Sequence, residues 1–444
     1  MDDRWSEAKC HDPYLRCALY GAAQVALGIK GCCVLAHSPQ GCFQLVDAAF
    51  GWQDADYTET VTLCTKLCED EIVYGGEATL LRTILEAREF DVPVLFVLTA
   101  CGPEIVGDDI LAVCEEAQPQ VPFQLVPIQC AGFRGDQNRG TDIALEAILE
   151  RLVPEADGQE HLPHSLVLVA PHANANPTWM GDLNWVKGVL AEMGAIVLAT
   201  LTHDTPLSDL RRIPYAEGSL LLSHDAGQPA IDALEAHFGI APWCQDLPLP
   251  IGFTNTQRWL SELGERLGAR GKAAELIARG EKLVIETCRR KGLEQAGLHR
   301  APTAVVADAT IGIPLLRFLC EDLEMIPELV CLRSAQPAAR ALLRRELAEL
   351  DLAPRIVFDA DVYAARAALA EARPEMVLGS NIERHAVEDL GIPFALRLLN
   401  PLSRVRLTDR AYFGYQGMLN IIEEIQNDRL DRYRSRYRRY KARW

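Results

Sequence analysis

The chain has 444 residues, of which 49% are hydrophobic and 24% are charged, a composition typical of a folded protein with large cores. Its net charge of −18 argues against nucleic acid and anionic membrane surfaces as partners. No apolar run reaches the roughly 18–20 residues that a membrane-spanning helix needs, and the acidic start of the chain does not resemble a signal peptide. We therefore expect a cytoplasmic protein with no membrane span.

Short apolar runs alternate with longer amphipathic segments along the chain. The helical segments include 335–350, 362–371 and the long region 255–295, which are rich in Ala, Leu, Glu and Arg. Several of the apolar runs consist of Val, Ile and Leu, as expected of parallel strands buried on both faces. This alternation predicts an α/β fold of doubly wound, Rossmann-like parallel sheets. The predicted strands are residues 32–36, 92–98, 123–127, 165–170, 195–200, 219–222, 303–307, 329–332, 355–358, 376–379 and 394–398.

Two polar seams, near 155–164 and 297–302, divide the chain. We expect three α/β domains, an N-terminal one at 1–160, a middle one at 161–298 and a C-terminal one at 299–444. The last sixteen residues carry eight Lys or Arg and one Asp, which indicates a basic terminal helix that packs on an acidic subunit or, alternatively, binds RNA or a partner. The glycine motifs of ATP-hydrolysing and dinucleotide-binding sites are absent, so we expect no nucleotide site on this chain.

Three of the fourteen cysteines stand in unusual contexts. Cys17 opens a small-residue helical segment, Cys42 ends the turn after strand 32–36, and Cys101 follows strand 92–98. The last two lie at carboxyl ends of strands, where α/β proteins bind ligands and where helix N-termini favour thiolate over thiol. Three thiolates are one too few for a closed four-cysteine cluster, so the other ligands would come from another side chain or from a second subunit. On spacing alone, burial in the core is the commoner explanation.

The other cysteines are better explained as packing residues than as metal ligands. Cys32 and Cys33 fall on a predicted strand and should be core residues. Cys64 and Cys68 are four residues apart on a segment that we expect to be helical, a spacing that suits either packing or a metal pair. Cys130 is either a core residue or a spare ligand.

For each of three polar residues near these turns, the sequence allows two roles. His37 is predicted to hydrogen-bond either a cluster sulfide or a backbone carbonyl, and such bonds tune metal clusters. Asp108 and Asp109 suit the start of a helix, where the dipole favours negative charge, better than a general acid–base pair.

Four segments in the first third of the chain resemble the nitrogenase component 1 family. Cys17 and the following ALYGA resemble the family's first cluster motif, and HSPQGC at 37–42 resembles its second. LTACGPEIVGDD at 98–109 resembles the third, and EDEIVYGG at 69–76 resembles the segment between them. The motifs occur in the family's order, while the rest of the chain matches more loosely through 248–252, 376–380 and 413–417.

The resemblance implies the K-type (β) subunit of an α2β2 complex. Cys17, Cys42 and Cys101 would hold one side of a P-type 8Fe-7S cluster shared with a D-type (α) catalytic subunit, or alternatively a 4Fe-4S cluster. Asp136 falls where some relatives carry a further, redox-dependent ligand, and its carboxylate is a harder donor than a thiolate. Alternatively, Asp136 is a solvated loop residue or a helix cap. An ATP-dependent iron protein would dock transiently and supply electrons. No catalytic residue is then expected on this chain.

One spacing and two missing cofactor ligands support the K-type assignment. The 25-residue interval from Cys17 to Cys42 resembles the K-type, Ser223 stands near the D-type cofactor cysteine, and the segment at Asn400 has no histidine. Cys244 and His385 are the alternatives for displaced cofactor ligands.

The compact chain with a full cysteine set is similar to the methylthio-alkane reductases, which cleave C–S bonds in small organic sulfur compounds. The segment 21–30 is also similar to the iron-only nitrogenases, so a nitrogenase β subunit is the next expectation. Tetrapyrrole-reducing relatives have an aspartate where Cys42 stands, which argues against them. A cofactor-assembly scaffold and a cluster-free α/β binding protein are alternatives from other classes.

Overall fold

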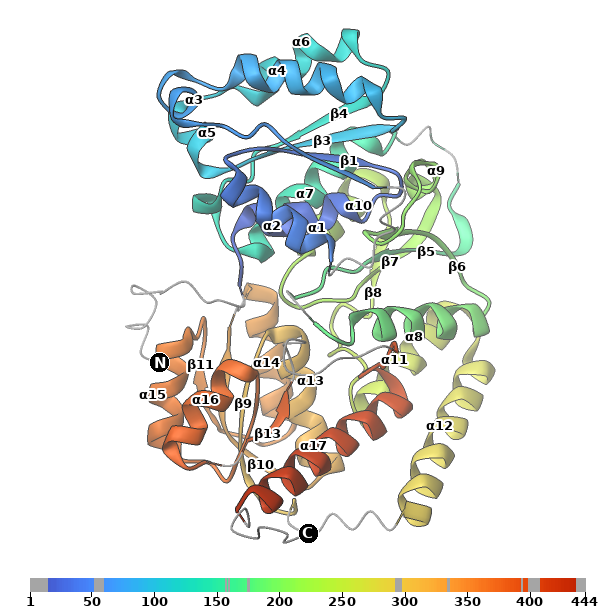
Figure 1. The fold of residues 1–444 in the computed structure, drawn as a ribbon. Coiled ribbons are helices and arrows are strands. Elements are labelled where there is room, and N and C mark those ends of the chain that lie inside the picture. The colour runs from blue at the N-terminus through green and yellow to red at the C-terminus, as the bar shows by residue number, and fades with distance from the viewer. Residues whose placement is uncertain are drawn as a thin grey trace, which may run out of the picture. The chain divides into compact units, whose positions relative to one another are not determined.

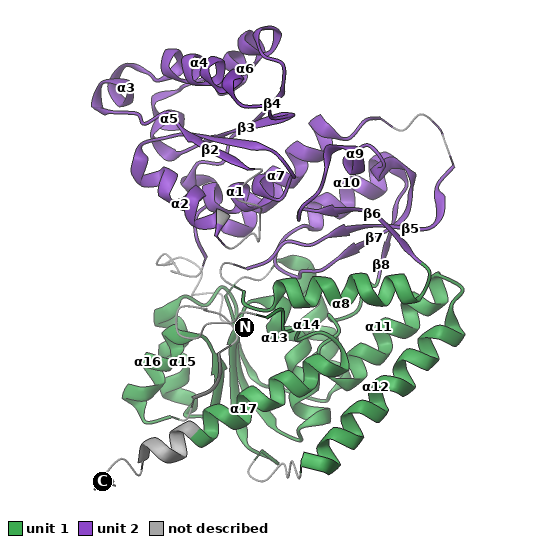
Figure 2. Cartoon of the chain, turned by 45° about the vertical axis from the view of Figure 1, so that its right-hand side comes forward, with its two compact units in different colours: residues 1–12, 175–194, 244–444 green, residues 13–174, 195–243 purple. Residues whose placement is uncertain are grey.

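The computed structural model describes residues 15–51, 60–155, 158, 160–173, 176–291, 298–333, 336–392, 394–397 and 408–436, without the side chains of 50, 394–397 and 431–436. The chain forms two compact units (Figure 2), each described by itself. Unit 2 comprises residues 13–174 and 195–243, and unit 1 comprises 1–12, 175–194 and 244–444. Together they contain three all-parallel sheets with helices against them (Figure 1), which confirms the predicted α/β class.

Unit 2 holds two of the sheets. The first has strand order β2-β1-β3-β4 and the second β6-β5-β7-β8. The central strands of both are buried, as their continuous apolar sequences predict. The first sheet consists of β1 (Cys33–His37), β2 (Val61–Cys64), β3 (Val94–Thr99) and β4 (Gln124–Ile128). The second consists of β5 (Leu162–Val169), β6 (Ile196–Leu201), β7 (Ala216–Leu221) and β8 (Ala241–Trp243).

Nine helices of unit 2 flank these sheets or connect their strands. They are α1 (Ala18–Leu27), α2 (Gln40–Phe50), α3 (Glu69–Tyr74), α4 (Glu77–Glu86), α5 (Cys101–Val106), α6 (Ile110–Ala117), α7 (Gln137–Leu152), α9 (Leu207–Leu210) and α10 (Gln228–Phe238), as described in this part of the chain. The short 3₁₀ turn η4 (Gly132–Arg134) joins β4 to α7.

Unit 1 is built on the third sheet, with strand order β11-β10-β9-β12-β13. Its strands are β9 (Pro302–Ala307), β10 (Ile326–Leu332), β11 (Arg355–Val357), β12 (Met376–Gly379) and β13 (Phe394–Arg397). Its helices are α8 (Trp179–Glu192), α11 (Phe253–Arg266), α12 (Arg270–Lys291), α13 (Ala309–Arg317), α14 (Pro337–Glu349), α15 (Val362–Ala372), α16 (Asn381–Leu390) and α17 (Gly414–Arg436).

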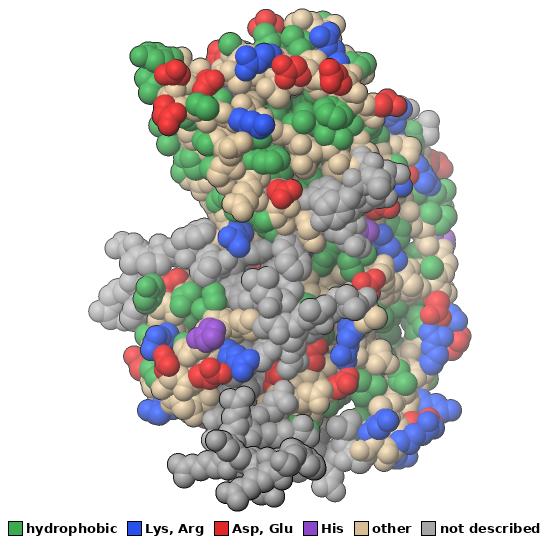
Figure 3. Space-filling view, viewed as in Figure 1, with side chains coloured by type: hydrophobic (Ala, Val, Ile, Leu, Met, Phe, Trp, Pro, Cys, Tyr) green, Lys and Arg blue, Asp and Glu red, His purple; other side chains and the backbone are tan. Residues whose placement is uncertain are grey.

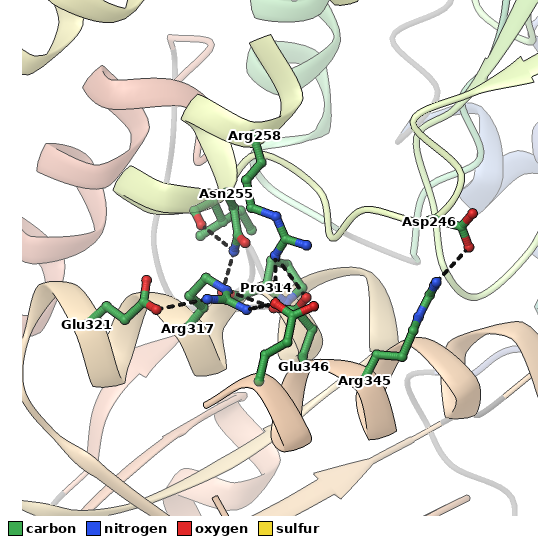
Figure 4. Close-up of polar contacts among 10 residues, drawn as sticks. Asp246, Asn255, Arg258, Pro314, Arg317, Glu321, Arg345 and Glu346 are labelled. Carbon is green, nitrogen blue, oxygen red and sulfur yellow. Dashed lines mark hydrogen bonds and ion pairs between the residues drawn. The ribbon is translucent and has the colours of Figure 1, made fainter. Parts of the chain in front are cut away.

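Charged side chains join three helices of unit 1 (Figure 4). The Arg317 guanidinium at the end of α13 donates to Glu346 on α14 at 2.8 Å and to Glu321 at 2.8 Å, and Arg258 on α11 donates to Glu346 at 3.0 Å. Asn255 on α11 donates to the carbonyl of Pro314, a proline inside α13, at 3.1 Å. Because Glu346 is buried, its two arginine partners are what make that burial tolerable.

The structure confirms most of the predicted elements and corrects some. Each predicted strand overlaps an observed one, but β2 and β8 were not predicted. The predicted helical region 255–295 is two helices, because the chain turns at Leu267–Gly268, where Gly268 has a positive φ of 61°. Each predicted domain contains one sheet, and its exact boundaries stay a prediction.

The basic tail is described only in part. Helix α17 extends to Arg436, while residues 437–444, and the side chains from 431 onward, lie outside the described residues. No helix among the described residues is both long and apolar enough to span a bilayer.

Candidate functional site

The first sheet brings the ends of four parallel strands to one edge. The register pairs His37 of β1 with Thr99 of β3, Leu98 with Ile128 of β4, and Ala36 with Cys64 of β2. The segments that follow these strands therefore emerge side by side at the carboxyl edge, as predicted for a ligand site in such a sheet.

Cys17 reaches this edge because α1 and α7 cross at very short distance. A Cβ added to Gly21 would lie 1.9 Å from the carbonyl oxygen of Gln137, and one added to Gly140 would lie 1.9 Å from that of Ala18. Only glycine permits this approach, which explains the small residues after Cys17. Cys17 is the N-cap of α1 without a side-chain cap bond, so its thiol is not used by the helix that it begins.

Asp136 stands beside Cys17 on the backbone. The two residues form an isolated antiparallel bridge, and the amide of Gln137 donates to the carbonyl of Arg16 at 2.6 Å. The Asp136 carboxylate accepts from the amide of Arg139 at 3.1 Å and so caps α7. The extra ligand role of Asp136 stays a prediction.

Cys42 and Cys101 lie in first helical turns rather than in the loops that the sequence predicted. Cys42 is the third residue of α2, and Cys101 is the first residue of α5. Burial raises the pKa of the Cys42 thiol, and the neighbouring thiols of Cys101, Cys17 and Cys64 raise it further. A bound cation would offset this rise in the pKa of Cys42.

Two of the predicted ligands converge over Gly132. A Cβ at this position would lie 3.1 Å from Sγ of Cys101 and 3.6 Å from Sγ of Cys17. The Gly132 amide donates to the Cys101 sulfur at 3.2 Å. A backbone donor to sulfur stabilises the charged form of a thiol and is one of the contacts that set cluster potentials.

Glu104 holds the η4 segment against the end of β3. Its carboxylate accepts from the Thr99 hydroxyl, from the amide of Ala131 at 3.1 Å and from Arg134 at 2.6 Å. These bonds fix the backbone around Gly132 that contacts the Cys101 sulfur. Sequence reasoning missed both Gly132 and Glu104, whose roles depend on contacts between segments that are distant in the sequence.

His37 faces Asp108 and not a carbonyl or a sulfide. Its Nε2 lies 2.9 Å from Oδ2 of Asp108, and its Nδ1 lies 3.3 Å from Oγ1 of Thr65. Burial lowers the pKa of His37 below its usual value, and the contact with Asp108 partly offsets this effect. The predicted helix-start role is confirmed for Asp109, whose carboxylate caps α6 through Leu111 and Ala112, but Asp108 is instead the partner of His37.

The other cysteines of this unit differ in burial. Cys32, Cys33 and Cys130 are fully buried, as expected of core residues, and burial raises the pKa of each thiol. The helical prediction for Cys64 and Cys68 was wrong, because Cys64 ends β2 and Cys68 is the exposed N-cap of α3.

Large apolar side chains lie exposed on and near α3 and α5. Tyr74 is 85% exposed, Ile105 73%, Val73 66% and Phe133 59%. Figure 3 shows hydrophobic and acidic side chains together at the corner of unit 2 where α3 lies. Because α5 begins with Cys101 and Phe133 adjoins Gly132, this apolar patch borders the thiols. Exposed apolar side chains gathered in this way are typical of interaction surfaces.

The arrangement of donors suits a multi-iron cluster better than a single ion. Among the residues that the structure describes, no three His, Cys, Asp or Glu side chains converge closely enough to bind one metal ion. A cluster places a different iron at each thiolate, so its ligands need not converge on one point. The half-buried thiols of Cys17, Cys42 and Cys101, with the amide of Gly132 directed at one of them, fit one side of such a group.

One of the cofactor-ligand positions considered from the sequence is used in local hydrogen bonds. The Ser223 hydroxyl accepts from the amides of Asp225 at 3.0 Å and Ala226 at 3.3 Å. Burial raises the pKa of the Cys244 thiol far above its usual range. Asn400 lies outside the described residues, and His385 lies on α16 in unit 1.

The fold and this thiol-lined edge define an α/β protein of the nitrogenase type. The solved structure of nitrogenase Cp1 at pH 6.5 matches 98% of this chain and 95% of its own chain with a TM-score of 0.79 and 18% identity, a likeness of fold. The nitrogenase molybdenum-iron protein beta chain of Methanococcus maripaludis is 27% identical over 95% of both chains. The vanadium-iron protein beta chain of Trichormus variabilis is 24% identical over 94% of this chain and 93% of its own.

The family model for nitrogenase component 1 type oxidoreductases matches residues 17–429. The chain therefore belongs to the nitrogenase component 1 family, as its cysteine motifs indicated. Relatives also include an iron-molybdenum cofactor biosynthesis protein of M. maripaludis, which is 26% identical over 92% of this chain and 82% of its own.

Proposed function

We propose that this chain is the electron-relaying, β-type subunit of a nitrogenase-like reductase. Cys17, Cys42 and Cys101 hold one side of an iron–sulfur cluster of the P type, and a D-type α subunit completes the cluster in an α2β2 complex. The convergence of half-buried thiols at the sheet edge around Gly132 carries this proposal. The beta chains among the relatives support it.

When bound, such a cluster stores and passes on single electrons at low potential. The residues of this chain hold and tune it. Cys17 and Cys101 supply thiolates from two helix starts that the α1–α7 crossing and β3 fix in place. The Gly132 amide donates to the Cys101 sulfur, and Glu104 keeps Gly132 in position through Ala131 and Arg134. No side chain of this chain is assigned to the substrate.

The apolar patch of Val73, Tyr74, Ile105 and Phe133 supports a partner at the same edge. Exposed aromatic and aliphatic side chains beside half-buried ligands are what a protein interface around a shared cluster requires. We assign this surface to the α subunit or to the docking iron protein, both of which must approach the cluster.

Anaerobic purification of the chain with its D-type partner tests the proposal through iron and sulfide content. We expect about eight irons per αβ pair from a P-type cluster, in addition to those of an active-site cofactor on the partner. The chain purified alone should hold little iron, because half of the ligands are missing. A stoichiometric cluster on the chain alone would contradict a shared site, and about four irons per pair would replace the 8Fe-7S cluster with a 4Fe-4S relay.

For the substrate, we propose small methylthio-alkanes, on the resemblance of this compact chain with a full cysteine set to the C–S-cleaving reductases. Dimethyl sulfide would take up two electrons and two protons and yield methane and methanethiol. The complex with its iron protein, ATP and dithionite should release both gases in equal amounts. Ammonia from dinitrogen without methanethiol would instead assign the complex to the iron-only nitrogenases.

A cofactor-assembly scaffold is the second candidate, because relatives include a cofactor biosynthesis protein. A scaffold builds a cluster and passes it on, so its iron should move to an apo-acceptor protein without substrate reduction. Multiple turnovers with iron retained on the complex would exclude this role.

A further inference from the structure

The buried His37 links the segments that carry Cys42 and Cys101. It ends β1, five residues before Cys42, and its own carbonyl accepts from the amide of Ala100 at 3.1 Å, directly before Cys101. Its ring has no exposed surface and contacts both Thr65 and Asp108. Thr65 in turn accepts from the amide of Ser38 at 3.0 Å, in the turn that leads to Cys42.

Asp108 connects His37 to the end of α3. Its side chain is almost fully buried, and its two oxygens accept from the Gly76 amide at 2.9 and 3.0 Å as well as facing His37. A Cβ at Gly76 would lie 3.0 Å from Asp108 Oδ2 and 3.0 Å from Cε1 of His37. The three residues therefore pack without spare space, and none can shift without moving the others.

The two ends of this chain of contacts have different environments. At one end, Gly76 follows α3, whose last residues, Val73 and Tyr74, are the exposed apolar side chains described above. At the other end lie the backbone segments of the predicted ligands Cys42 and Cys101. A carboxylate buried without a cationic side chain is costly, and here its charge is met only by backbone and imidazole donors.

We propose that His37 and Asp108 are positioning residues that couple the α3 surface to the Cys42 and Cys101 turns. A partner that moves α3 shifts Gly76, and the Gly76–Asp108–His37 contacts carry the shift to the thiols. The same buried carboxylate lowers the cluster's affinity for an added electron. This inference rests on the proposed function and deepens it, since it names the residues through which docking at α3 changes the position of the thiols that hold the cluster.

The test compares Asp108→Asn with Asp109→Asn in the anaerobically purified complex. Both variants remove one negative charge at neighbouring positions, but Asp109 is exposed and only caps α6, a role that Asn also fills. Iron content is measured first, followed by amide hydrogen exchange and the midpoint potential of the cluster by redox titration with EPR detection.

In Asp108→Asn we expect faster exchange in two separate peptides, those covering residues 69–80 and 37–43. The change should be about tenfold or more, the effect of losing a hydrogen bond to a charged group. The midpoint potential should rise, because a buried negative charge near the cluster is gone. Asp109→Asn should change neither, because an exposed charge is screened.

Exchange that changes only in residues 69–80, with an unchanged midpoint potential, would overturn the inference and leave Asp108 as a local cap. An iron-free wild-type complex would instead defeat the proposed function, while the exchange comparison would still decide the coupling. If Asp108→Asn does not fold, Thr65→Val removes the hydroxyl between His37 and Ser38 without a charge change. Faster exchange of 37–43 together with 69–80 supports the coupling there, and exchange confined to 37–43 opposes it.

Discussion

The carboxyl edges of the first and third sheets are both formed by the ends of parallel strands, but the side chains at these ends differ in kind. At the first, the strand ends lead to half-buried thiols bordered by exposed apolar side chains. At the third, Arg333 after β10 donates to Glu383 at 2.6 Å and to the Ser380 hydroxyl at 3.1 Å, and both charged side chains are 2% exposed. Asp308 after β9 caps α13.

The difference shows that a parallel sheet provides a place for ligands and that the side chains at its strand ends decide its use. At the third edge, an ion pair and a helix cap hold the charged side chains within the same unit. At the first edge the half-buried thiols are not paired with charged side chains in this way, and burial, followed by the neighbouring thiols, raises the pKa of Cys42. Changes at the first edge should therefore affect metal content, and changes at the third should affect stability.

The largest effect is expected at a predicted ligand. Cys101→Ala removes the thiolate that accepts the Gly132 amide, and the complex should lose most of its iron and its turnover. Cys130→Ala is the matched control, because Cys130 is fully buried two residues before Gly132 and donates only to the Thr99 carbonyl. It should keep its iron. Equal iron in the two variants, measured by elemental analysis on the purified complex, would remove the distinction between ligand and packing cysteines.

At the third edge, Arg333→Met leaves Glu383 buried without its cation. Breaking a buried pair in this way should reduce the free energy of unfolding by about 3–5 kcal/mol, as measured by urea denaturation. Iron per folded complex should stay at the wild-type level. A stability within 1 kcal/mol of wild type would show that water or other groups, and not the ion pair, satisfy this edge.

A smaller, pH-dependent effect is expected at Asp142 on α7. Burial raises the pKa of its carboxyl to about 6, partly offset by the Gly227 amide, which donates to it at 2.7 Å. Because the folded state holds the proton more tightly than the unfolded chain, wild-type stability should fall as pH rises from about 4 to about 6 and level off above that. Asp142→Asn keeps an acceptor for Gly227 and should lack this loss.

The gain of Asp142→Asn over wild type should grow across that window to on the order of 1–3 kcal/mol. Urea unfolding of the full chain at pH 4.5 and 7.5 measures it. A gain that is the same at both pH values would mean that Asp142 is ionised throughout.

The smallest structural effect is expected at the apolar patch. Tyr74→Ala should change the free energy of unfolding by less than about 0.5 kcal/mol, because the side chain is 85% exposed, yet it should lower iron-protein-dependent turnover several-fold. Tyr363→Ala on α15 is the control from the other unit, at 70% exposed. If both variants turn over at the wild-type rate with unchanged complex formation, the patch is not a partner surface.

The fold could largely be predicted from periodicity, because buried parallel strands are continuous apolar runs. The missed strands β2 and β8 are short edge strands, and neither VTLC nor APW differs clearly from a loop. The break between α11 and α12 depends on one glycine, Gly268, in a left-handed conformation that a helical pattern does not reveal.

The candidate site could be predicted from the sequence only at residues whose type indicates metal binding, which here are cysteines. Cys17, Cys42 and Cys101 were found through their contexts and their family resemblance. Gly132 and the His37–Asp108 pair were not, because their roles depend on which strand ends adjoin. The register that places His37 beside Thr99 arises from the folded sheet and cannot be read from local sequence.

Cysteine alkylation read by mass spectrometry tests the central claim most directly. In the loaded complex, Cys17, Cys42 and Cys101 should be protected from iodoacetamide while the exposed Cys68 reacts. After iron is removed with a chelator, the three should react as well, and fully buried cysteines such as Cys130 should stay unmodified. Alkylation of all three in the iron-loaded complex, with its iron retained, would contradict the assignment of these thiols to the cluster.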